Sequence, residues 1–242
     1  MISVSSSETA SYSSSHVPWG LRDTIYAVLT ALTLVLLGIG IRLGAAWLGL
    51  VSLSTSGRVL AAFALEAVLL IPAWVWGPGK YGGGWAILGL RRFPFGRSTA
   101  LGSASLAFIM VVNTIWELLR RRLGWPGQPS SLPFFGEGLP GLGLALLLGA
   151  GVAPVAEEIF FRGYLYAGLR ARWGLGWAMF ASAAIFSLAH LVPGVLPPIF
   201  FTGVVLAAVF EGSGSLWPCI VLHSTINALA FIAAYLAQRL PA

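Results

Sequence analysis

The chain has little charge and almost no cysteine. Only 9% of its residues are charged, against roughly 25% in soluble globular domains. The single cysteine, Cys219, excludes an intramolecular disulfide and a clustered thiolate metal site. It lies in an apolar run, where we expect it to pack as a small core residue. The first twenty residues have no basic region ahead of an apolar stretch, which argues against a secretory signal peptide.

Long apolar runs take the place of charge. Hydrophobic residues make up 57% of the chain, and the mean hydropathy is +0.86. A membrane helix needs about 20 mostly apolar residues, so 242 residues leave room for about seven to eight crossings. The sequence therefore predicts an all-α protein, a polytopic transmembrane helical bundle with its active site in a cavity between helices. We expect it to be a multi-pass protein of the cell (plasma or inner) membrane.

Clusters of proline and glycine separate the apolar runs and indicate turns. The predicted spans cover residues 24–50, 59–76, 99–119, 139–161, 175–191, 195–210 and 216–236. Residues 1–20 are rich in serine and are predicted to form a disordered tail. The remainder, 21–242, is expected to be a single domain with its catalytic helices within 139–237.

The net charge of +6 does not indicate a nucleic-acid partner. The basic residues lie mostly between apolar runs, where they would meet lipid headgroups. We therefore expect membrane lipids as partners and no nucleic acid, while the oligomeric state is left open. Lys80 is the only lysine among many arginines, which is typical of a GC-rich prokaryotic genome.

Polar residues interrupt the apolar helices in three places. Such residues are costly in a bilayer and are candidates for function. The three motifs are Glu157-Glu158 with Arg162, Phe186 with His190, and His223 with Asn227.

The spacing of residues in the first motif suggests different roles for its two glutamates. Glu158 and Arg162 are four residues apart and share a helix face, so they can form an ion pair. Glu157 is displaced from Glu158 by about 100° around the axis and is free to face a cavity. The pairs in the other two motifs are also four residues apart, so three helices can present polar groups to one site.

A carboxylate, two histidines and an amide suit peptide hydrolysis. A carboxylate can take a proton from water, alone or with a metal that lowers the pKa of that water. Glu157, His190 and His223 also match the ligand set of many catalytic Zn²⁺ sites. Asn227 and one histidine can donate hydrogen bonds to the developing oxyanion. Both mechanisms are open at this point.

The ordered motifs resemble those of the CAAX-protease and bacteriocin-processing (CPBP) family of intramembrane endopeptidases. The specific part of the resemblance runs over residues 153–227, and the segment 88–92, Leu-Gly-Leu-Arg-Arg, is similar to one in bacterial members. The resemblance implies an all-helical membrane fold. It also implies cleavage of a membrane-associated peptide or protein near the membrane surface, in eukaryotic members after a prenylated cysteine.

The resemblance also assigns roles to residues. Glu157 and His190 would activate water, and His223 and Asn227 would hold the oxyanion. Glu158, Arg162 and Phe186 would support them. Members of the family have been described as metalloproteases, and a metal-free, glutamate-dependent mechanism is also proposed for them.

Other interpretations compete with a protease. The glutamates can form a solvated helix end, and the histidines can be packed or bridge helices. The same fold can serve as a non-proteolytic scaffold or a bacteriocin-immunity protein. A proton- or ion-coupled carrier could use Glu66, which we expect either to pair with an arginine or to border the cavity. Asn113 is expected to link helices, and Glu117 to pair with the arginines at 120 and 121.

Overall fold

The computed structural model describes residues 17–50, 55–125 and 130–239, and every regular element in these ranges is helical. The α-helices are α1 (Leu21–Trp47), α2 (Thr55–Val68), α3 (Leu70–Val75), α4 (Pro78–Tyr81), α5 (Phe95–Arg122), α6 (Gly138–Leu144), α7 (Ala153–Glu158), α8 (Ala167–Leu188), α9 (Leu196–Ser213) and α10 (Leu216–Ala237). The 3₁₀ helices are η2 (Gly84–Leu88), η3 (Leu132–Phe135) and η6 (Pro193–Val195), and the π-helical stretches are η4 (Ala145–Val152) and η5 (Ile159–Tyr166). The predicted polytopic all-α bundle is therefore confirmed.

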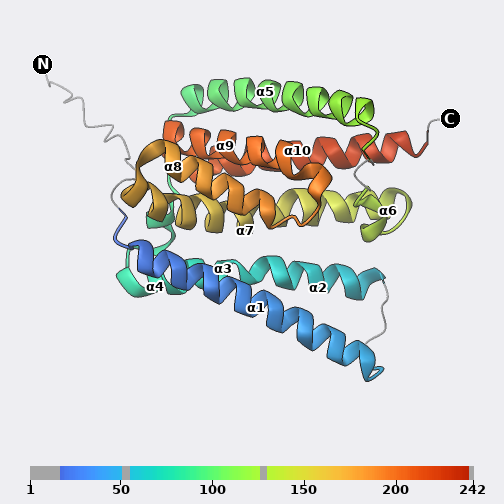
Figure 1. Ribbon diagram of the computed structural model, residues 1–242, viewed down its shortest axis with the longest axis horizontal. Helices are drawn as coiled ribbons and strands as arrows, with labels where there is room; N and C mark the ends of the chain where they lie inside the picture. Colours follow the sequence, from blue (N-terminus) through green and yellow to red (C-terminus); the bar gives the residue numbers. More distant parts are fainter. Residues whose placement is uncertain (1–16, 51–54, 126–129, 240–242) are drawn as a thin grey trace, which may run out of the picture.

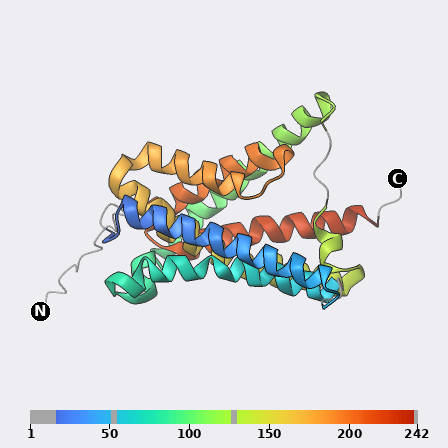
Figure 2. The same ribbon diagram turned by 60° about the horizontal axis from the view of Figure 1, so that its bottom comes forward.

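The long helices run roughly along one direction (Figures 1 and 2). Helix α5 lies on one side of the bundle and α1 to α4 on the other, with α6 to α10 between them (Figure 1). Helix α5 packs on α9 and α10, whereas α2 packs on α7. The helices that carry the three motifs are therefore the central ones.

Among the described residues, five helices are long and apolar enough to cross a membrane. The count of seven to eight is not reached on this criterion. One of the five, Gly138–Leu188, contains the predicted span 139–161 and all but the last three residues of the predicted span 175–191. It is broken at Gly174, whose φ of 75° favours glycine, and the chain turns back there (Figure 1). The predicted span 59–76 is divided between the shorter helices α2 and α3.

The helix bearing the glutamates is irregular on both sides. Helix α7 lies between the π-helical stretches η4 and η5, and Pro154 occupies its first turn. Proline removes a backbone donor and displaces the preceding turn. Wide turns of this kind often occur at functional sites, so the local sequence distorts the backbone where Glu157 and Glu158 are placed.

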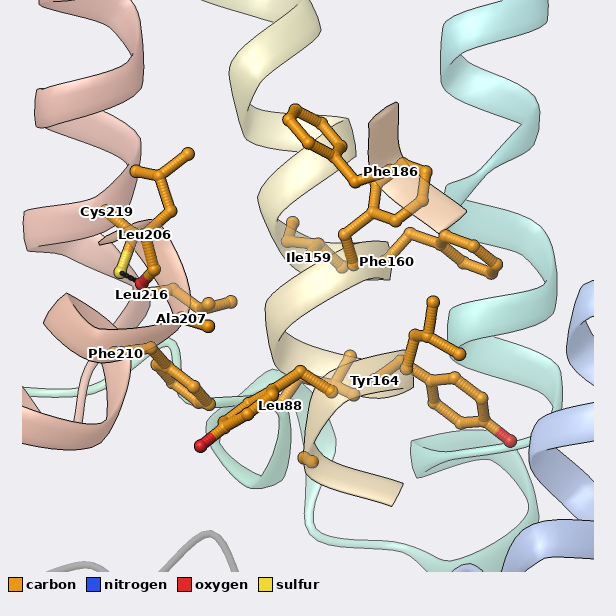
Figure 3. Close-up of a cluster of buried hydrophobic side chains, with 14 of the residues drawn as sticks. Leu88, Ile159, Phe160, Tyr164, Phe186, Leu206, Ala207, Phe210, Leu216 and Cys219 are labelled. Atoms are coloured by element: carbon orange, nitrogen blue, oxygen red, sulfur yellow. Dashed lines mark hydrogen bonds between the residues drawn. The ribbon is translucent and has the colours of Figure 1, made fainter. Parts of the chain in front are cut away.

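A buried apolar cluster surrounds η5 and ends at the motif residues. Phe160 and Tyr164 of η5, Leu206 of α9 and Leu216 of α10 belong to it (Figure 3). Phe186 lies at the edge of this cluster in Figure 3 and is buried. The cluster thus fixes the helix bearing the glutamates against the helices bearing the histidines.

Cys219 packs as expected from the sequence. It is fully buried, and its thiol donates a hydrogen bond to the carbonyl oxygen of Leu206 at 3.4 Å (Figure 3). This contact joins α10 to α9.

Ordered contacts begin within the predicted tail. Residues 1–16 lie outside the described residues, but Trp19 is buried, stacks on Tyr164, and donates from Nε1 to the Tyr164 carbonyl oxygen at 3.2 Å. Asp23 accepts hydrogen bonds from Lys80 and Tyr81, which ties the start of α1 to α4. The boundary predicted at residue 20 is therefore too late, because Trp19 fills part of the core.

The segment 88–92 docks on the turn between α9 and α10. Gly89 has a φ of 97°, and its carbonyl oxygen accepts a hydrogen bond from the Leu216 amide at 2.9 Å. The Arg91 Nε donates to the Gly214 carbonyl oxygen at 2.8 Å. This segment therefore holds the beginning of α10, two turns before His223.

Candidate active site

Glu158 and Arg162 form the predicted ion pair inside the bundle. Arg162 Nη1 donates to Glu158 Oε1 at 2.7 Å, and the two residues are 0% and 1% exposed. The guanidinium also lies 4.1 Å from the centre of the Phe186 ring. Since an unpaired charge at this depth would be costly, the pair explains how two adjacent glutamates are accommodated.

His223 lies between the two glutamates. Its Nδ1 is 2.8 Å from Glu158 Oε1. An ionised carboxylate can only accept, so this contact requires the tautomer whose Nδ1–H donates a hydrogen bond to Glu158. Its Nε2 lies 3.7 Å from Glu157 Oε2, which is longer than a hydrogen bond. Glu158 therefore orients the His223 ring and turns Nε2 toward Glu157. The sequence did not predict this contact, because the two residues are 65 positions apart.

His190 is not on a helix, contrary to the prediction. It follows the end of α8 and is exposed. Its Nδ1 donates to the Phe186 carbonyl oxygen at 2.9 Å, which leaves Nε2 as an acceptor. Leu191, next in the chain, has a φ of 57°, and this left-handed residue ends the helix. The ring of Phe186 meets both His190 and His223 edge to face.

Asn227 faces the same space from one turn further along α10. Its Nδ2 donates to the Gly149 carbonyl oxygen of η4 at 3.0 Å. An amide nitrogen has two protons, so one of them is left for another acceptor. The contact with η4 holds the Asn227 side chain in place.

A cavity of about 560 Å³ joins these groups. Phe186, His190, His223 and Asn227 all line it, whereas Glu157 is not among its lining residues. The side chain of Glu157 is 14% exposed and lies next to His223, which lines the cavity. Hydrogen bonds at catalytic sites are often long before substrate binds.

One wall of the cavity comes from α5, which the sequence analysis did not place in the site. The lining residues of α5 are Asn113, Trp116, Glu117 and Arg120. Their spacing is that of one helix face, a signal that the sequence contains but that ordinary membrane-helix packing also produces. Arg120 and Arg121 pair with Glu117 as predicted. No hydrogen bond of the Asn113 side chain oxygen to another helix is present within the described part of the chain.

Glu66 is in neither of the two expected places. Among the described side chains, no arginine pairs with it, and it does not line the cavity. Its carboxyl group instead lies near enough to Glu157 to interact with it electrostatically, because α2 packs on α7.

The proposed zinc ligands are not gathered around one point. In the described ranges, no three His, Cys, Asp or Glu side chains are arranged to hold a metal ion. Glu157 and His223 approach each other, whereas His190 packs across the Phe186 ring. This arrangement of donors does not fit a metal site formed by Glu157, His190 and His223.

Comparison with known proteins supports the family resemblance that the three motifs suggest. No curated protein and no solved structure matches the chain. Residues 140–229 match the family model described as type II CAAX prenyl endopeptidase Rce1-like. The matched segment runs from α6 into α10 and contains the three motifs, while α1 to α5 lie outside it. The match confirms the resemblance found in the motifs, and residues 140–229 of this membrane protein form a domain of the Rce1-like family of CAAX-type intramembrane endopeptidases.

Proposed function

We propose that this protein hydrolyses a peptide bond of a membrane-associated peptide or protein with water activated by Glu157. The observation that carries the proposal is the position of His223 between Glu158 and Glu157. His223 also lines a cavity together with His190 and Asn227. The Rce1-like domain supports the reaction class. The substrate and the role of each residue are part of the proposal.

In the proposed step, a water molecule in the cavity gives a proton to the Glu157 carboxylate while its oxygen attacks the carbonyl carbon of the substrate. His190 Nε2 is free to accept a hydrogen bond from the same water, because its Nδ1 is held by Phe186. Glu157 then passes its proton to the leaving nitrogen, the C–N bond breaks, and a carboxylic acid and an amine form; the acid then releases the second proton of the water to become a carboxylate. Such general base catalysis is commonly worth about 100- to 10,000-fold in rate.

His223 and Asn227 would stabilise the oxyanion from one face of α10. When ionised, Glu157, Glu158 and Arg162 together carry one negative charge, so a proton on His223 Nε2 would make the cluster neutral. In that form His223 donates from both nitrogens, to Glu158 and to the substrate oxygen. The free amide proton of Asn227 supplies a second donor, and each donor is commonly worth about 3 kcal/mol.

The cavity suits a short stretch of peptide. Its volume of about 560 Å³ is within the range of ligand pockets, about 300–1,000 Å³. A lipid attached to the peptide could lie along the apolar exterior of the helices. We propose the cell membrane as the location, and both lipidated and unmodified peptides as substrate forms to be tested.

The test is cleavage of quenched fluorogenic peptides, farnesylated and unmodified, by the purified full-length protein. Glu157→Gln keeps the shape of the side chain and removes the base, so we expect its rate to fall by about 100- to 10,000-fold. Glu137→Gln is the matched control, because Glu137 is exposed and precedes α6 outside the cavity. We expect that variant to cleave like the parent protein.

Two outcomes separate the alternatives. Equal cleavage by the parent protein and Glu157→Gln would overturn the role of Glu157, and failure of the folded parent to cleave any peptide would favour a scaffold or immunity protein. A strong chelator is added in parallel. Persistent cleavage supports glutamate-activated water, whereas activity that is lost and then restored by Zn²⁺ would support the zinc mechanism.

A further inference from the structure

The face of α5 that lines the cavity lies outside the Rce1-like domain. Asn113, Trp116, Glu117 and Arg120 of α5 form a wall opposite His223 and Asn227 of α10. The matched family segment begins only at residue 140. Any contact between this wall and a substrate is therefore a property of this chain beyond the matched domain.

Three of these four side chains already have partners within the protein. Trp116 Nε1 donates to the Gly194 carbonyl oxygen at 2.9 Å, which joins α5 to the turn after His190. Arg120 donates from Nε and Nη2 to the two carboxylate oxygens of Glu117, at 2.9 and 2.7 Å. Its Nη1 donates to the carbonyl oxygen of Trp125 at 2.5 Å. These contacts build the wall and fix its position.

Asn113 is the exception. Its side-chain oxygen Oδ1 is buried and has no hydrogen-bond partner within the described part of the chain, although the residue lines the cavity. A buried acceptor without a donor costs free energy, and that cost is recovered when a donor arrives. Because Oδ1 has already lost its water, a hydrogen bond to a ligand would need little further desolvation.

We propose that Asn113 is a substrate-positioning residue whose carboxamide hydrogen-bonds a main-chain amide of the peptide in the cavity. A carboxamide matches a peptide unit, since its oxygen accepts from an N–H and its nitrogen donates to a C=O. Rotation about the last side-chain torsion is soft, so the amide can turn to meet the peptide. The inference rests on the proposed peptidase function and extends it to α5.

The first test compares Asn113→Leu with the parent protein on a peptide that the parent cleaves. Leucine has a similar size and cannot hydrogen-bond, so we expect KM to rise about tenfold, the effect of one hydrogen bond, with kcat nearly unchanged. Thr114→Val is the matched control, because Thr114 is exposed on the neighbouring position of α5 and its hydroxyl donates to the Met110 carbonyl oxygen of the same helix. That variant should have the KM of the parent.

A second test identifies the contact itself. A series of peptides carries an ester in place of one main-chain amide, which removes one N–H at a time. At the position bound by Asn113, the ester should weaken cleavage by the parent protein about tenfold and weaken cleavage by Asn113→Leu far less. Equal losses in both proteins at every position, or a KM unchanged by Asn113→Leu, would overturn the proposal.

Folding and function are separated in the same experiment. The melting temperature of each variant in detergent is measured, and Asn113→Ala, which also cannot hydrogen-bond through its side chain, replaces Asn113→Leu if leucine lowers it. Asn113 is not proposed to touch the reacting atoms, so the two proposals can fail separately. If the parent protein cleaves peptides but the ester substitutions affect it and Asn113→Leu equally, only the Asn113 contact is contradicted. If the parent protein cleaves no peptide, the proposed function is contradicted, and the Asn113 contact, which rests on it, is contradicted as well.

Discussion

At the residue scale, Glu158 has two partners on one oxygen. Its Oε1 accepts from both Arg162 and His223, so the same carboxylate balances a buried cation and orients a candidate catalytic ring. Histidines at catalytic sites often depend on such a second contact for their orientation. Stability and turnover are therefore linked at this residue, and substitutions can separate them.

Either Glu158→Leu or Arg162→Met alone should destabilise the protein by about 3–5 kcal/mol, because each leaves a buried charge without its partner. The double variant removes both charges and should be more stable than either single variant, yet its cleavage rate should stay low, because His223 has lost its acceptor. Melting temperatures in detergent and peptide cleavage rates check this. A double variant that is less stable than both single variants, or that cleaves like the parent protein, contradicts the ion-pair account.

Local spacing explains why some of these contacts could be predicted from the sequence. Glu158 and Arg162 are four residues apart on one helix, and the predicted pair is present. The contact of His223 with Glu158 spans 65 positions, and that of Asn227 with Gly149 spans 78. Helical periodicity gives the face on which a residue lies but not the helix that faces it, so these contacts required the tertiary structure.

At the element scale, the site depends on how α10 is held where it begins. A Cβ on Gly89 would lie 2.6 Å from the ring of Phe210 and 3.3 Å from Leu216. Segment 88–92 can therefore approach the turn between α9 and α10 only because residue 89 has no side chain. The sequence of this segment resembles one in bacterial family members, and the structure supplies a physical reason for its glycine.

Gly89→Ala should destabilise the protein more than Gly49→Ala does. Both glycines have positive φ, but nothing lies within 4 Å of a Cβ at Gly49. The left-handed conformation alone should cost about 1–2 kcal/mol, and the clash at Gly89 should add about 1–3 kcal/mol. Thermal unfolding of the two variants measures the difference. Equal stability of both would show that the close approach at Gly89 is unimportant.

The element boundaries show where sequence patterns fail. The apolar run of residues 59–76 was predicted to be one span, but it forms α2 and α3, with Pro72 in the second helix. Proline removes a helix hydrogen bond without making the sequence less apolar. Hydropathy therefore located the apolar run but not its division into two helices, neither of which is long enough to count as a membrane span by itself.

At the scale of the whole molecule, the outer surface carries many large apolar side chains. Leu36, Leu37 and Ile41 on α1 are 66%, 56% and 63% exposed. In water such a surface would lead to aggregation, whereas lipid covers it without cost. The apolar composition therefore predicted the class of fold correctly, although it could not show that α5 closes the cavity.

We expect the protein to remain in the membrane pellet after an alkaline carbonate wash, because apolar helices that span a bilayer are not released by breaking ionic contacts. A peripheral protein attached by its net charge of +6 would be released to the supernatant. Immunodetection in the two fractions distinguishes these results, and recovery of the protein in the supernatant would contradict the multi-pass fold.

The proposed function depends on Glu157, next to His223, as the base that activates water in the cavity lined by His190, His223 and Asn227. The most direct measurement is the initial rate of peptide hydrolysis by the parent protein and by Glu157→Gln, purified in the same detergent and matched in melting temperature. We expect the parent protein to hydrolyse the peptide and the variant to do so about 100- to 10,000-fold more slowly. Equal rates in the two folded proteins would contradict this role of Glu157.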